Sequence, residues 1–483
     1  MLQGTGSNVG KSLLTAGLCR ALTHRGLSVR PFKPQNMSNN AAVTADGGEI
    51  GRAQALQARA CRVPAVSDMN PVLLKPQTDI GAQVVVRGRV IGNAKAQDYQ
   101  RLRPTLLPAV LDSFRRLAAD ADLVLVEGAG SPAEVNLRAG DIANMGFAEA
   151  ADLPVVLIAD IDRGGVIASI VGTWALLEEA ERQRLRGIII NKFRGDVRLF
   201  DDGLRIIHER TSLGCFGVVP WFQGASRLPA EDAVAVQDYQ ARSGGDIRVA
   251  VPVFSRIANF DDLDPLIGES DVTVDFVERG RALPVCDLIV LPGSKSTLAD
   301  LAVLRAEGWD IDILSHVRRG GKVVGICGGY QMLGVKISDP DGLEGSAGAA
   351  AGLGLLAVET VLTRTKSLVE ARGEDVGTGV SVEGYEMHLG RTTGPGLIRP
   401  MLRLDSRPDG CVSSDDRVFG CYLHGLFASD AFRAAFLRQL RSDRSGGPAY
   451  QQSVEETLDA LADHLAHHLD IKAILASAAP VRR

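Results

Sequence analysis

The chain of 483 residues has no excess of basic residues, and this limits the kinds of partner that it can bind. Lys and Arg together number 53 against 58 Asp and Glu, so the formal net charge is -5 at pH 7. Proteins that bind a nucleic-acid backbone usually carry a basic surface that neutralises the phosphates. The composition therefore predicts that nucleic acid is not a partner.

The sequence also lacks paired cysteines and long apolar runs. Its 7 cysteines are scattered, with no C-x-x-C pair and no metal-ligand spacing, and this pattern is typical of reduced thiols in a cytosol. No segment approaches the ~18 uncharged apolar residues of a membrane span, and no basic patch followed by an apolar run opens the chain. We expect a soluble, cytoplasmic protein without a membrane-spanning segment.

The length and the apolar pattern predict an α/β fold in two domains. A chain of 483 residues exceeds the size at which one hydrophobic core keeps growing. Short runs rich in Val, Ile and Leu recur, with helical patterns between them, and such runs are typical of parallel strands buried on both faces. These predicted strands are residues 123–127, 155–160, 187–191, 216–220, 287–293 and 322–327, with alternating segments at 381–390 and 418–424.

Polar residues between 238 and 246 indicate the domain boundary. We predict a parallel-sheet domain over residues 1–240, a second α/β domain over 247–441, and a C-terminal helical segment, 442–483, packed on the second domain. The Gly- and Ala-rich residues 339–354 are either a mobile lid or a long surface loop.

A phosphate-binding loop is indicated by residues 4–12, which read Gly-Thr-Gly-Ser-Asn-Val-Gly-Lys-Ser and precede an apolar helical pattern. Glycines let backbone N–H groups turn towards an anion at the helix amino terminus, Lys11 would meet the terminal phosphates, and the Ser12 hydroxyl would bind Mg²⁺. Gly4 lies one residue further upstream than in the strict G-x-x-x-x-G-K-[ST] pattern, so a Gly-rich turn before an ordinary helix is the alternative. The residues predicted to bind the nucleotide are Gly4, Thr5, Gly10, Lys11, Ser12 and, as a reader of the adenine edge, Asn191.

Only two residues precede Gln3 and Gly4, too few to span a sheet. Either the native start lies upstream or this strand is poorly supported.

Carboxylates near the predicted sheet edge are candidates for the metal shell. Glu127 ends the run Leu-Val-Leu-Val, which puts it at the carboxyl edge where ligands bind in open α/β sheets. We predict that it binds Mg²⁺ together with Ser12; capping the following turn is its alternative role. Asp46 and Glu49 lie in a Gly-rich loop and would complete the shell through water, although surface solvation explains them equally well.

The spacing between Gly4-Thr5 and Gly10 resembles that of dethiobiotin synthetase and its relatives, which activate a carboxylate with ATP. This resemblance implies that Lys33, in Pro-Phe-Lys-Pro-Gln-Asn, neutralises the phosphate or the reacting carboxylate. Partition-type ATPases have a second lysine in the loop, and none lies between Gly4 and Val9 here.

In the second half, an apolar strand leads into Gly325-Ile-Cys327-Gly-Gly329, which matches a nucleophile elbow. Such a turn exposes the thiol and directs the next N–H, that of Gly328, at an oxyanion. His424, at the end of a later strand, is placed to act as the base. A buried structural cysteine and a satisfied core histidine are the respective alternatives.

The run Gly-Ile-Cys-Gly-Gly-Tyr-Gln-Met-Leu-Gly resembles the class I glutamine amidotransferase domain. The resemblance implies that Gly293 and Ser294, in Leu-Pro-Gly-Ser-Lys-Ser-Thr, supply the second oxyanion donor. This family carries a glutamate two residues after the histidine, whereas Leu426 stands here, so the site is either a Cys-His dyad or takes its acid from elsewhere. Glu386 and His388 either line a glutamine pocket or are structural.

Three further segments extend the resemblance over nearly the whole chain: Lys-Pro-Gln-Asn-Met-Ser-Asn-Asn, Ser-Asp-Met-Asn-Pro-Val-Leu-Leu-Lys-Pro and Leu-Pro-Gly-Ser-Lys-Ser-Thr. With its halves in this order, the chain resembles the glutamine-hydrolysing amide synthases of cobalamin biosynthesis. The resemblance implies ATP, Mg²⁺ and glutamine as nitrogen donor. It also implies a corrinoid substrate, adenosylcobyrinic acid a,c-diamide, whose carboxylates b, d, e and g become amides, with one ATP and one glutamine used for each.

Alternatives stay open at this point. One is the synthase of the same pathway that amidates carboxylates a and c, and another, of a different class, is a P-loop ATPase switch whose Cys domain is a non-catalytic binding module. A thiol peptidase would explain no residue of the first half. A homodimer is also compatible with the sequence.

Overall fold

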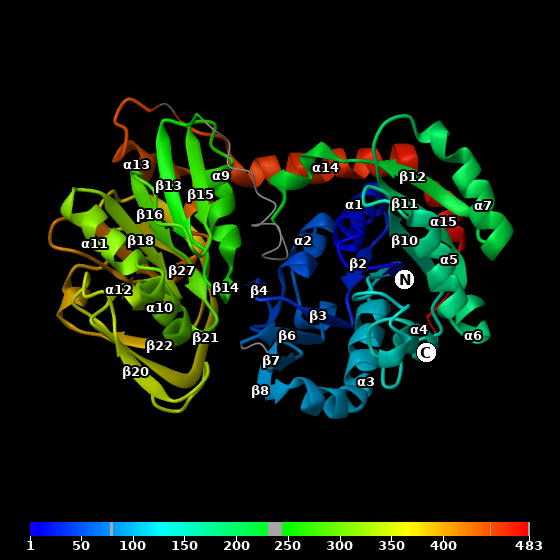
Figure 1. The fold of residues 1–483 in the computed structure, drawn as a ribbon, viewed down its shortest axis with the longest axis horizontal. Helices are drawn as coiled ribbons and strands as arrows, with labels where there is room; N and C mark the ends of the chain where they lie inside the picture. The colour runs from blue at the N-terminus through cyan, green and yellow to red at the C-terminus, as the bar shows by residue number, and fades with distance from the viewer. Residues whose placement is uncertain (78–80, 230–243, 445, 482–483) are drawn as a thin grey trace.

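The computed structural model describes residues 1–77, 81–229, 244–444 and 446–481. They form two α/β parts that lie side by side, the N-terminal half (residues 1–229) and the C-terminal half (residues 244–441), and a long C-terminal helix begins beside the C-terminal half and runs along the N-terminal half (Figure 1). The predicted boundary at residue 240 lies outside the described residues.

The N-terminal half is built on parallel strands. Four of them pair in the order β1-β10-β11-β12, and the parallel pair β2-β9 joins this sheet through a bridge between Leu2 and Glu127. Each residue of β10 is buried, as expected for a strand covered on both faces. The strands are β1 (Leu2–Gly4), β2 (Val29–Phe32), β9 (Leu123–Val126), β10 (Val155–Asp160), β11 (Leu185–Phe193) and β12 (Cys215–Pro220).

Helices pack on both faces of this sheet, and short 3-10 turns lie in the segments between helices and strands. The helices are α1 (Lys11–His24), α2 (Arg52–Ala60), α3 (Ala96–Ala119), α4 (Met145–Ala150), α5 (Val166–Leu176), α6 (Glu179–Arg182) and α7 (Asp201–Thr211). The turns are η1 (Ser67–Met69), η2 (Val135–Leu137), η3 (Val197–Phe200) and η4 (Gln223–Arg227).

A smaller sheet, ordered β3-β6-β7-β8, and the hairpin β4-β5 lie towards the C-terminal half. Ala41, Leu73 and Val85 from these strands form an apolar cluster with Met387 of the other half, so the two halves share buried surface. The strands are β3 (Gln35–Met37), β4 (Ala41–Val43), β5 (Glu49–Gly51), β6 (Val72–Pro76), β7 (Gly81–Val86) and β8 (Arg89–Lys95).

The C-terminal half repeats the parallel design, with the order β15-β13-β16-β18-β26 and an antiparallel edge strand β25. These strands are β13 (Ile247–Pro252), β15 (Val272–Val277), β16 (Leu288–Leu291), β18 (Lys322–Ile326), β25 (Cys411–Val412) and β26 (Val418–Cys421). Its helices and turns are η5 (Phe260–Leu263), α9 (Asp264–Ile267), α10 (Thr297–Ala306), α11 (Trp309–Arg318), α12 (Gly328–Leu333), η6 (Pro395–Ile398), η7 (Leu426–Ala428) and α13 (Asp430–Arg438).

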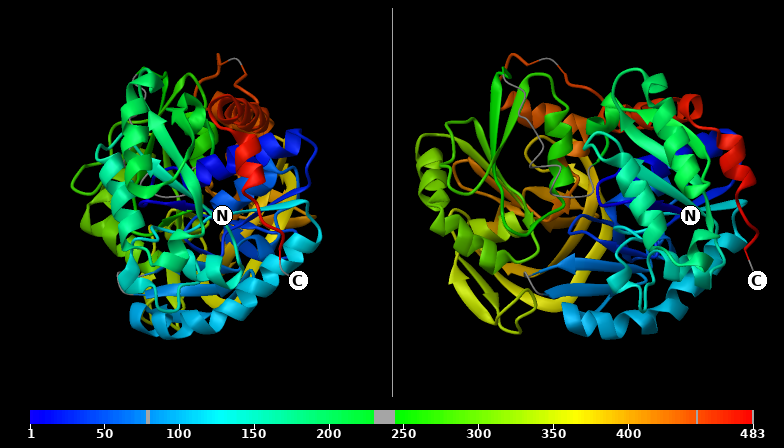
Figure 2. Two further views of the ribbon diagram at one scale, coloured as in Figure 1. Left: turned by 90° about the vertical axis from the view of Figure 1, so that its right-hand side faces the viewer. Right: turned by 45° about the vertical axis from the view of Figure 1, so that its right-hand side comes forward.

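A second, mostly antiparallel sheet is dominated by the long hairpin β21-β22, which curves alongside the N-terminal half (Figure 2). Residues 339–354, predicted as a lid or a loop, contain β20, which pairs with β19. The remaining strands are β14 (Ile257–Ala258), β17 (Gly293–Ser294), β19 (Lys336–Asp339), β20 (Gly348–Ala351), β21 (Glu359–Asp375), β22 (Ser381–Thr393), β23 (Leu402–Leu404), β24 (Arg407–Asp409) and β27 (Leu423–His424).

The C-terminal helices α14 (Tyr450–His468) and α15 (Ile471–Ala476) pack on the N-terminal half, not on the C-terminal half as predicted. The apolar face of α14 meets α1, where Gly17 leaves room: a Cβ there would lie 2.5 Å from Leu465 Cδ1. Arg20 of α1 and Arg59 of α2 both form ion pairs with Glu455. Apolar contacts with α1 and ion pairs with Arg20 and Arg59 together hold α14 against the N-terminal half.

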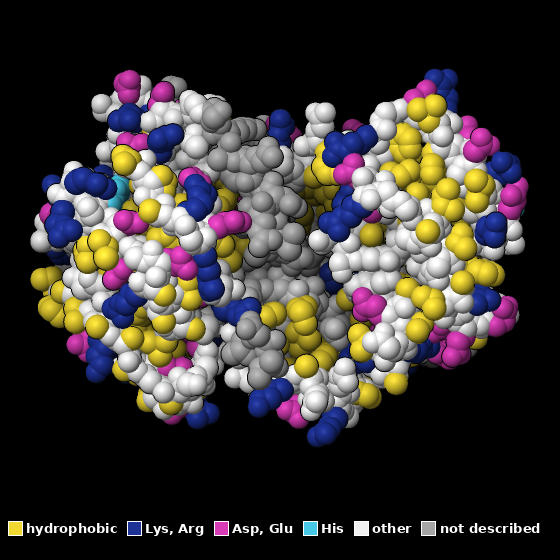
Figure 3. Space-filling model, viewed as in Figure 1, with side chains coloured by type: hydrophobic (Ala, Val, Ile, Leu, Met, Phe, Trp, Pro, Cys, Tyr) yellow, Lys and Arg dark blue, Asp and Glu magenta, His cyan; other side chains and the backbone are white. Residues whose placement is uncertain are grey.

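Basic and acidic side chains are interspersed on the face of the molecule shown in Figure 3. Within the described ranges, no helix combines the length and the apolar character that crossing a bilayer requires.

Candidate active sites

The phosphate-type loop connects β1 to α1. Gly10 has a φ of 95° and a Cβ there would lie 2.2 Å from Asn191 Nδ2, so glycine is required both by the backbone and by the space. Asn191 Nδ2 donates to Val9 O at 2.8 Å. This contact gives Asn191 a role in holding the loop, and reading of the adenine edge stays a prediction.

Two lysines lie at this loop. Lys11 Nζ donates to the carbonyl oxygens of Gly6 and Gly130, each at 2.9 Å. Lys192, at the end of β11, donates to Asn8 O at 2.6 Å and pairs with Asp160 at 2.8 Å. No sequence motif marked Lys192, because partition-type ATPases carry their second lysine inside the loop, whereas this one comes from β11, which is separated from β1 by β10.

Glu127 is the centre of the polar cluster at the carboxyl end of the sheet. Its carboxylate, with no exposed surface, accepts from Ser12 Oγ and from Lys33 Nζ, each at 2.8 Å, and from Gln57 Nε2 at 2.6 Å. The structure thus brings together three predicted residues from distant segments and adds Gln57 of α2. No local signal marked Gln57, since its role depends on how α2 packs over the loop.

The Ser12–Glu127 pair has the hard oxygen donors that Mg²⁺ prefers. In the described part of the chain, no group of three or more His, Cys, Asp or Glu side chains gathers as a metal site. A hydroxyl and a carboxylate are oxygen donors that suit a magnesium ion, and binding of Mg²⁺ by Ser12 and Glu127 stays a prediction.

Glu49 and Asp46 do not join that pair. Glu49 is fully buried and binds Lys75 at 2.9 Å and Lys366 of β21, and despite burial these two lysines hold the pKa of its carboxyl far below the usual range. Asp46 accepts from the Ser67 hydroxyl at 2.6 Å. Glu49 instead belongs to an ion cluster between the two halves.

Cys327 lies at a sharp turn between β18 and α12, with φ 53° and ψ -108°. A positive φ is strained for a residue with a Cβ and is typical of the nucleophile at a strand-to-helix turn; Cys327 itself is buried, with 8% of its surface exposed. Glycine is required at position 329, because a Cβ there would lie 2.0 Å from Leu291 O. The elbow predicted from the flanking glycines is thus present.

His424 faces this thiol and is oriented by an acidic residue that the sequence did not identify. Asp262 Oδ2 bonds His424 Nδ1 at 2.7 Å, and its Oδ1 accepts from Gly425 N at 2.6 Å. Burial opposes a charge on the imidazole, yet Asp262 and then Cys327 raise the pKa of His424 to about 10. The arrangement is therefore a Cys-His-Asp triad.

The predicted oxyanion donors lie beside the thiol. A Cβ on Gly328 would lie 2.8 Å from Ser294 N, so these two backbone segments are in direct contact. Ser294 pairs with Ile257 in the short β14-β17 ladder, and its hydroxyl donates to Asp300 at 2.6 Å. The amides of Gly328 and Ser294 are thus held at the mouth of one small pocket.

That pocket is lined by charged groups from both halves. Besides Cys327 and His424 it includes Lys75, Lys295, Glu344, Lys366 and His388. Burial lowers the pKa of Lys366 to about 7 and that of His388 to about 4. Glu386 does not line the pocket; it is buried in an ion pair with Arg407.

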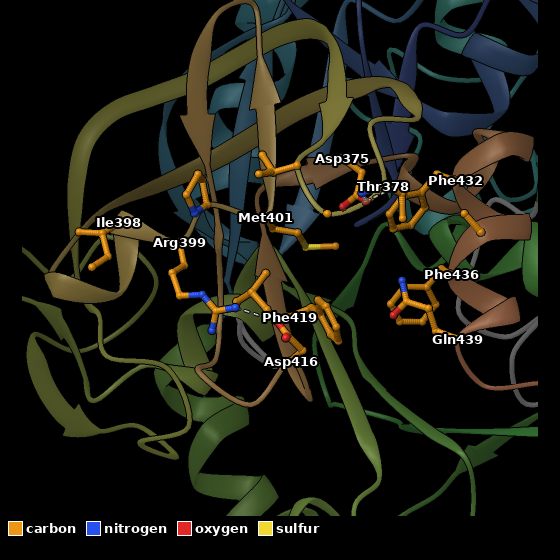
Figure 4. A pocket seen from close by; sticks show the side chains of 15 residues that line it. Asp375, Thr378, Ile398, Arg399, Met401, Asp416, Phe419, Phe432, Phe436 and Gln439 are labelled. Atoms are coloured by element: carbon orange, nitrogen blue, oxygen red, sulfur yellow. Dashed lines mark hydrogen bonds and ion pairs between the residues drawn. The ribbon is translucent and has the colours of Figure 1, made fainter.

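A larger hollow of about 550 Å³ lies between residues 375–378 and 398–401 on one side and α13 on the other (Figure 4). Phe419, Phe432 and Phe436 line it, and Arg399 pairs with Asp416 at its edge, at 2.8 Å. It shares no residue with the Cys327 pocket.

Comparison with known families agrees with the two sites. A CobQ/CobB/MinD/ParA nucleotide binding domain matches residues 1–235, and a CobB/CobQ-like glutamine amidotransferase domain matches residues 248–432. Fold, triad and these matches define a glutamine amidotransferase domain joined to a nucleotide-binding domain.

Full-length relatives narrow the class. Cobyric acid synthases from Rhodobacter capsulatus and Sinorhizobium fredii are 61% and 60% identical, over 99% and 97% of both chains. That of Methylorubrum populi is 60% identical over 100% of this chain and 99% of its own. The chain belongs to the cobyric acid synthase family. A solved glutamine amidotransferase overlaps 40% of this chain and 97% of its own at 18% identity, with a TM-score of 0.31, too low to support an argument.

Proposed function

We propose that the chain catalyses ATP- and glutamine-dependent amidation of carboxylates b, d, e and g of adenosylcobyrinic acid a,c-diamide, giving adenosylcobyric acid. The observation that carries this proposal is the presence of a Cys327-His424-Asp262 triad and a Ser12-Lys33-Glu127 cluster on one chain whose full-length relatives are cobyric acid synthases.

In the glutaminase reaction the Cys327 thiolate attacks the amide carbon of glutamine. The amides of Gly328 and Ser294 stabilise the charge that develops on the carbonyl oxygen. His424 gives its proton to the departing ammonia and then takes one from the water that hydrolyses the thioester. The Asp262 carboxylate keeps the imidazole in the orientation that both steps need.

In the synthetase reaction a corrinoid carboxylate attacks the γ-phosphate of ATP, which releases ADP and forms an acyl phosphate. Lys11 and Lys33 offset negative charge on the phosphate and on the attacking carboxylate, while the glycine-rich loop orients the chain of phosphates. Magnesium held by Ser12 and Glu127 would supply further charge neutralisation on the phosphate oxygens. The acyl phosphate is then attacked by ammonia to give the amide and inorganic phosphate.

The thiol site and the ATP site are linked by ammonia, which is mostly protonated and therefore non-nucleophilic once it reaches water near pH 7. Replacing Cys327→Ser should abolish glutamine-dependent amidation and leave amidation with high ammonium intact, because only the nitrogen source is lost. Both activities can be measured on the corrinoid diamide with ATP. Loss of both in a folded variant would contradict the two-site proposal.

Product mass separates this proposal from the a,c-diamide synthase: four new amides are expected instead of two. The switch-type alternative with a non-catalytic Cys domain predicts no glutamine hydrolysis, and the complete triad argues against it.

A further inference from the structure

Helix α2 of the N-terminal half touches both sites. At its second turn, Gln57 donates to Glu127 at 2.6 Å and to Ser12 O at 3.3 Å. At its first residue, Arg52 reaches the C-terminal half and pairs with Asp261 at 2.9 Å. Figure 1 shows α2 on the side of the N-terminal half that faces its neighbour. Five residues of helix separate these contacts by only about 7.5 Å, so one rigid element spans the distance.

Arg52 is connected to His424 by three short routes. It donates to the Tyr385 hydroxyl and lies 5.3 Å from the centroid of that ring, which stacks on the His424 imidazole at 5.1 Å and 17°. Its partner Asp261 is adjacent in sequence to Asp262, which binds His424 Nδ1.

The third route runs through β4. Arg52 donates to Ala41 O at 3.1 Å, and Ala41 N donates to Asn259 Oδ1 at 3.0 Å. Asn259 Nδ2 in turn lies 3.4 Å from His424 Nε2. All three routes therefore end at the His424 imidazole. The Tyr385 route ends at the face of the ring, the Asp261 route at Nδ1 through Asp262, and the β4 route at Nε2.

We propose that Arg52 is a positioning residue for the His424 base, and that α2 thereby couples glutamine hydrolysis to nucleotide binding at Ser12 and Glu127. This inference rests on the proposed function of both sites. A nucleotide that rearranges the bonds of Ser12 and Glu127 changes the contact of Gln57, and a shift of α2 moves Arg52 against Asp261 and Tyr385. Small displacements of a base have large kinetic effects, since about 1 Å can cost a hundredfold in rate.

The test compares four variants of the full chain. Arg52→Gln removes the charge, Arg52→Lys keeps it, and Tyr385→Phe removes the hydroxyl while keeping the ring on His424. Arg59→Gln is the matched control, because Arg59 ends the same helix but pairs with Glu455 at 2.6 Å, on the side of α14. Glutaminase kcat and KM are measured with and without MgATP and the corrinoid diamide, and amidation with ammonium is measured in parallel.

We expect Arg52→Gln to lower the glutaminase kcat about tenfold or more with a KM for glutamine near that of the wild type, since the base and not the pocket is displaced. Arg52→Lys should restore part of this loss, and Tyr385→Phe should show a smaller loss. Nucleotide should accelerate wild-type and Arg59→Gln glutaminase but neither Arg52→Gln nor, in full, Tyr385→Phe. Ammonium-dependent amidation should persist in each variant.

The inference is overturned if Arg52→Gln keeps the wild-type kcat, if it still responds to nucleotide, or if wild-type glutaminase is indifferent to nucleotide. Those outcomes leave the proposed function standing. A wild-type protein that hydrolyses no glutamine at all would instead remove the proposed function itself.

Discussion

Asp262 is the single residue that most changes the chemistry expected at the thiol site. It comes from the turn η5, 162 positions before His424, and both of its oxygens are used on the His424-Gly425 segment. A carboxylate in this place fixes which imidazole nitrogen faces Cys327 and favours the protonated form.

Asp262→Asn should therefore lower glutaminase kcat by about a hundredfold or more, as expected when the orienting acid of a triad is removed. Ammonium-dependent amidation is the internal control, because it does not use the triad. A variant that retained more than half of the wild-type glutaminase rate would contradict the role given to Asp262.

The same contact predicts a pH dependence of stability. Burial lowers the pKa of His424, but Asp262 outweighs it and raises that pKa from 6.5 to about 10 in the folded chain. Because the pKa of His424 is higher in the folded chain, the contact stabilises the fold fully at pH values below the pKa of the unfolded state. This stabilisation is lost as the pH rises through the pKa of the folded state. The advantage of wild type over Asp262→Asn in free energy of unfolding should thus shrink between pH 6.5 and 10, as urea titrations at several pH values can measure; a constant difference would contradict it.

Among the secondary-structure elements, the helix α14 has the clearest energetic role. It packs over α1, the helix that begins with Lys11 and Ser12, and Leu461 lies against Gly17 at their crossing. The strands of the parallel sheets were predictable from continuous apolar runs, because burial on both faces leaves a local composition signal. The element that α14 packs against was not predictable, because an amphipathic pattern indicates that one face of a helix is buried but does not indicate which surface buries it.

Leu461→Ala should reduce the free energy of unfolding by about 2–5 kcal/mol, the cost of a cavity at a buried leucine. The loss should appear as weaker ATP binding with little change in glutaminase KM, because the N-terminal half is the part that loosens. Leu199→Ala, where the leucine is 82% exposed, is the control. It should stay within about 0.5 kcal/mol of wild type, and equal losses in both variants would contradict the packing role of α14.

For the whole molecule, the contact between the two halves includes buried charges that lie beside the thiol pocket. Glu49 of the N-terminal half lies between Lys75 and Lys366, and both lysines line the pocket that contains Cys327. These buried charges join the two halves beside the pocket that contains Cys327.

Glu49→Gln should cost about 3–5 kcal/mol of stability, because two buried lysines lose their carboxylate. It should also raise the amount of glutamine hydrolysed per amide formed, since a looser interface lets ammonia escape. Glu209→Gln removes a carboxylate from an exposed pair with Arg205 and serves as control. Unchanged stability and unchanged stoichiometry in Glu49→Gln would show that the cluster is not needed to hold the halves together.

The sequence by itself determined the local chemistry: the loop with Lys11 and Ser12, the elbow at Cys327, and the strand ends carrying Glu127 and His424. Each of these depends on neighbours a few positions away, where glycines and apolar runs leave a readable pattern.

Only the tertiary structure decided which distant groups meet. Asp262 at His424, Gln57 at Glu127, Glu49 among lysines and Arg52 at Asp261 are contacts between segments that share no periodicity and no motif. Such contacts follow from how the sheets and helices pack, because a polar side chain finds its partner only after the elements that carry it are in place.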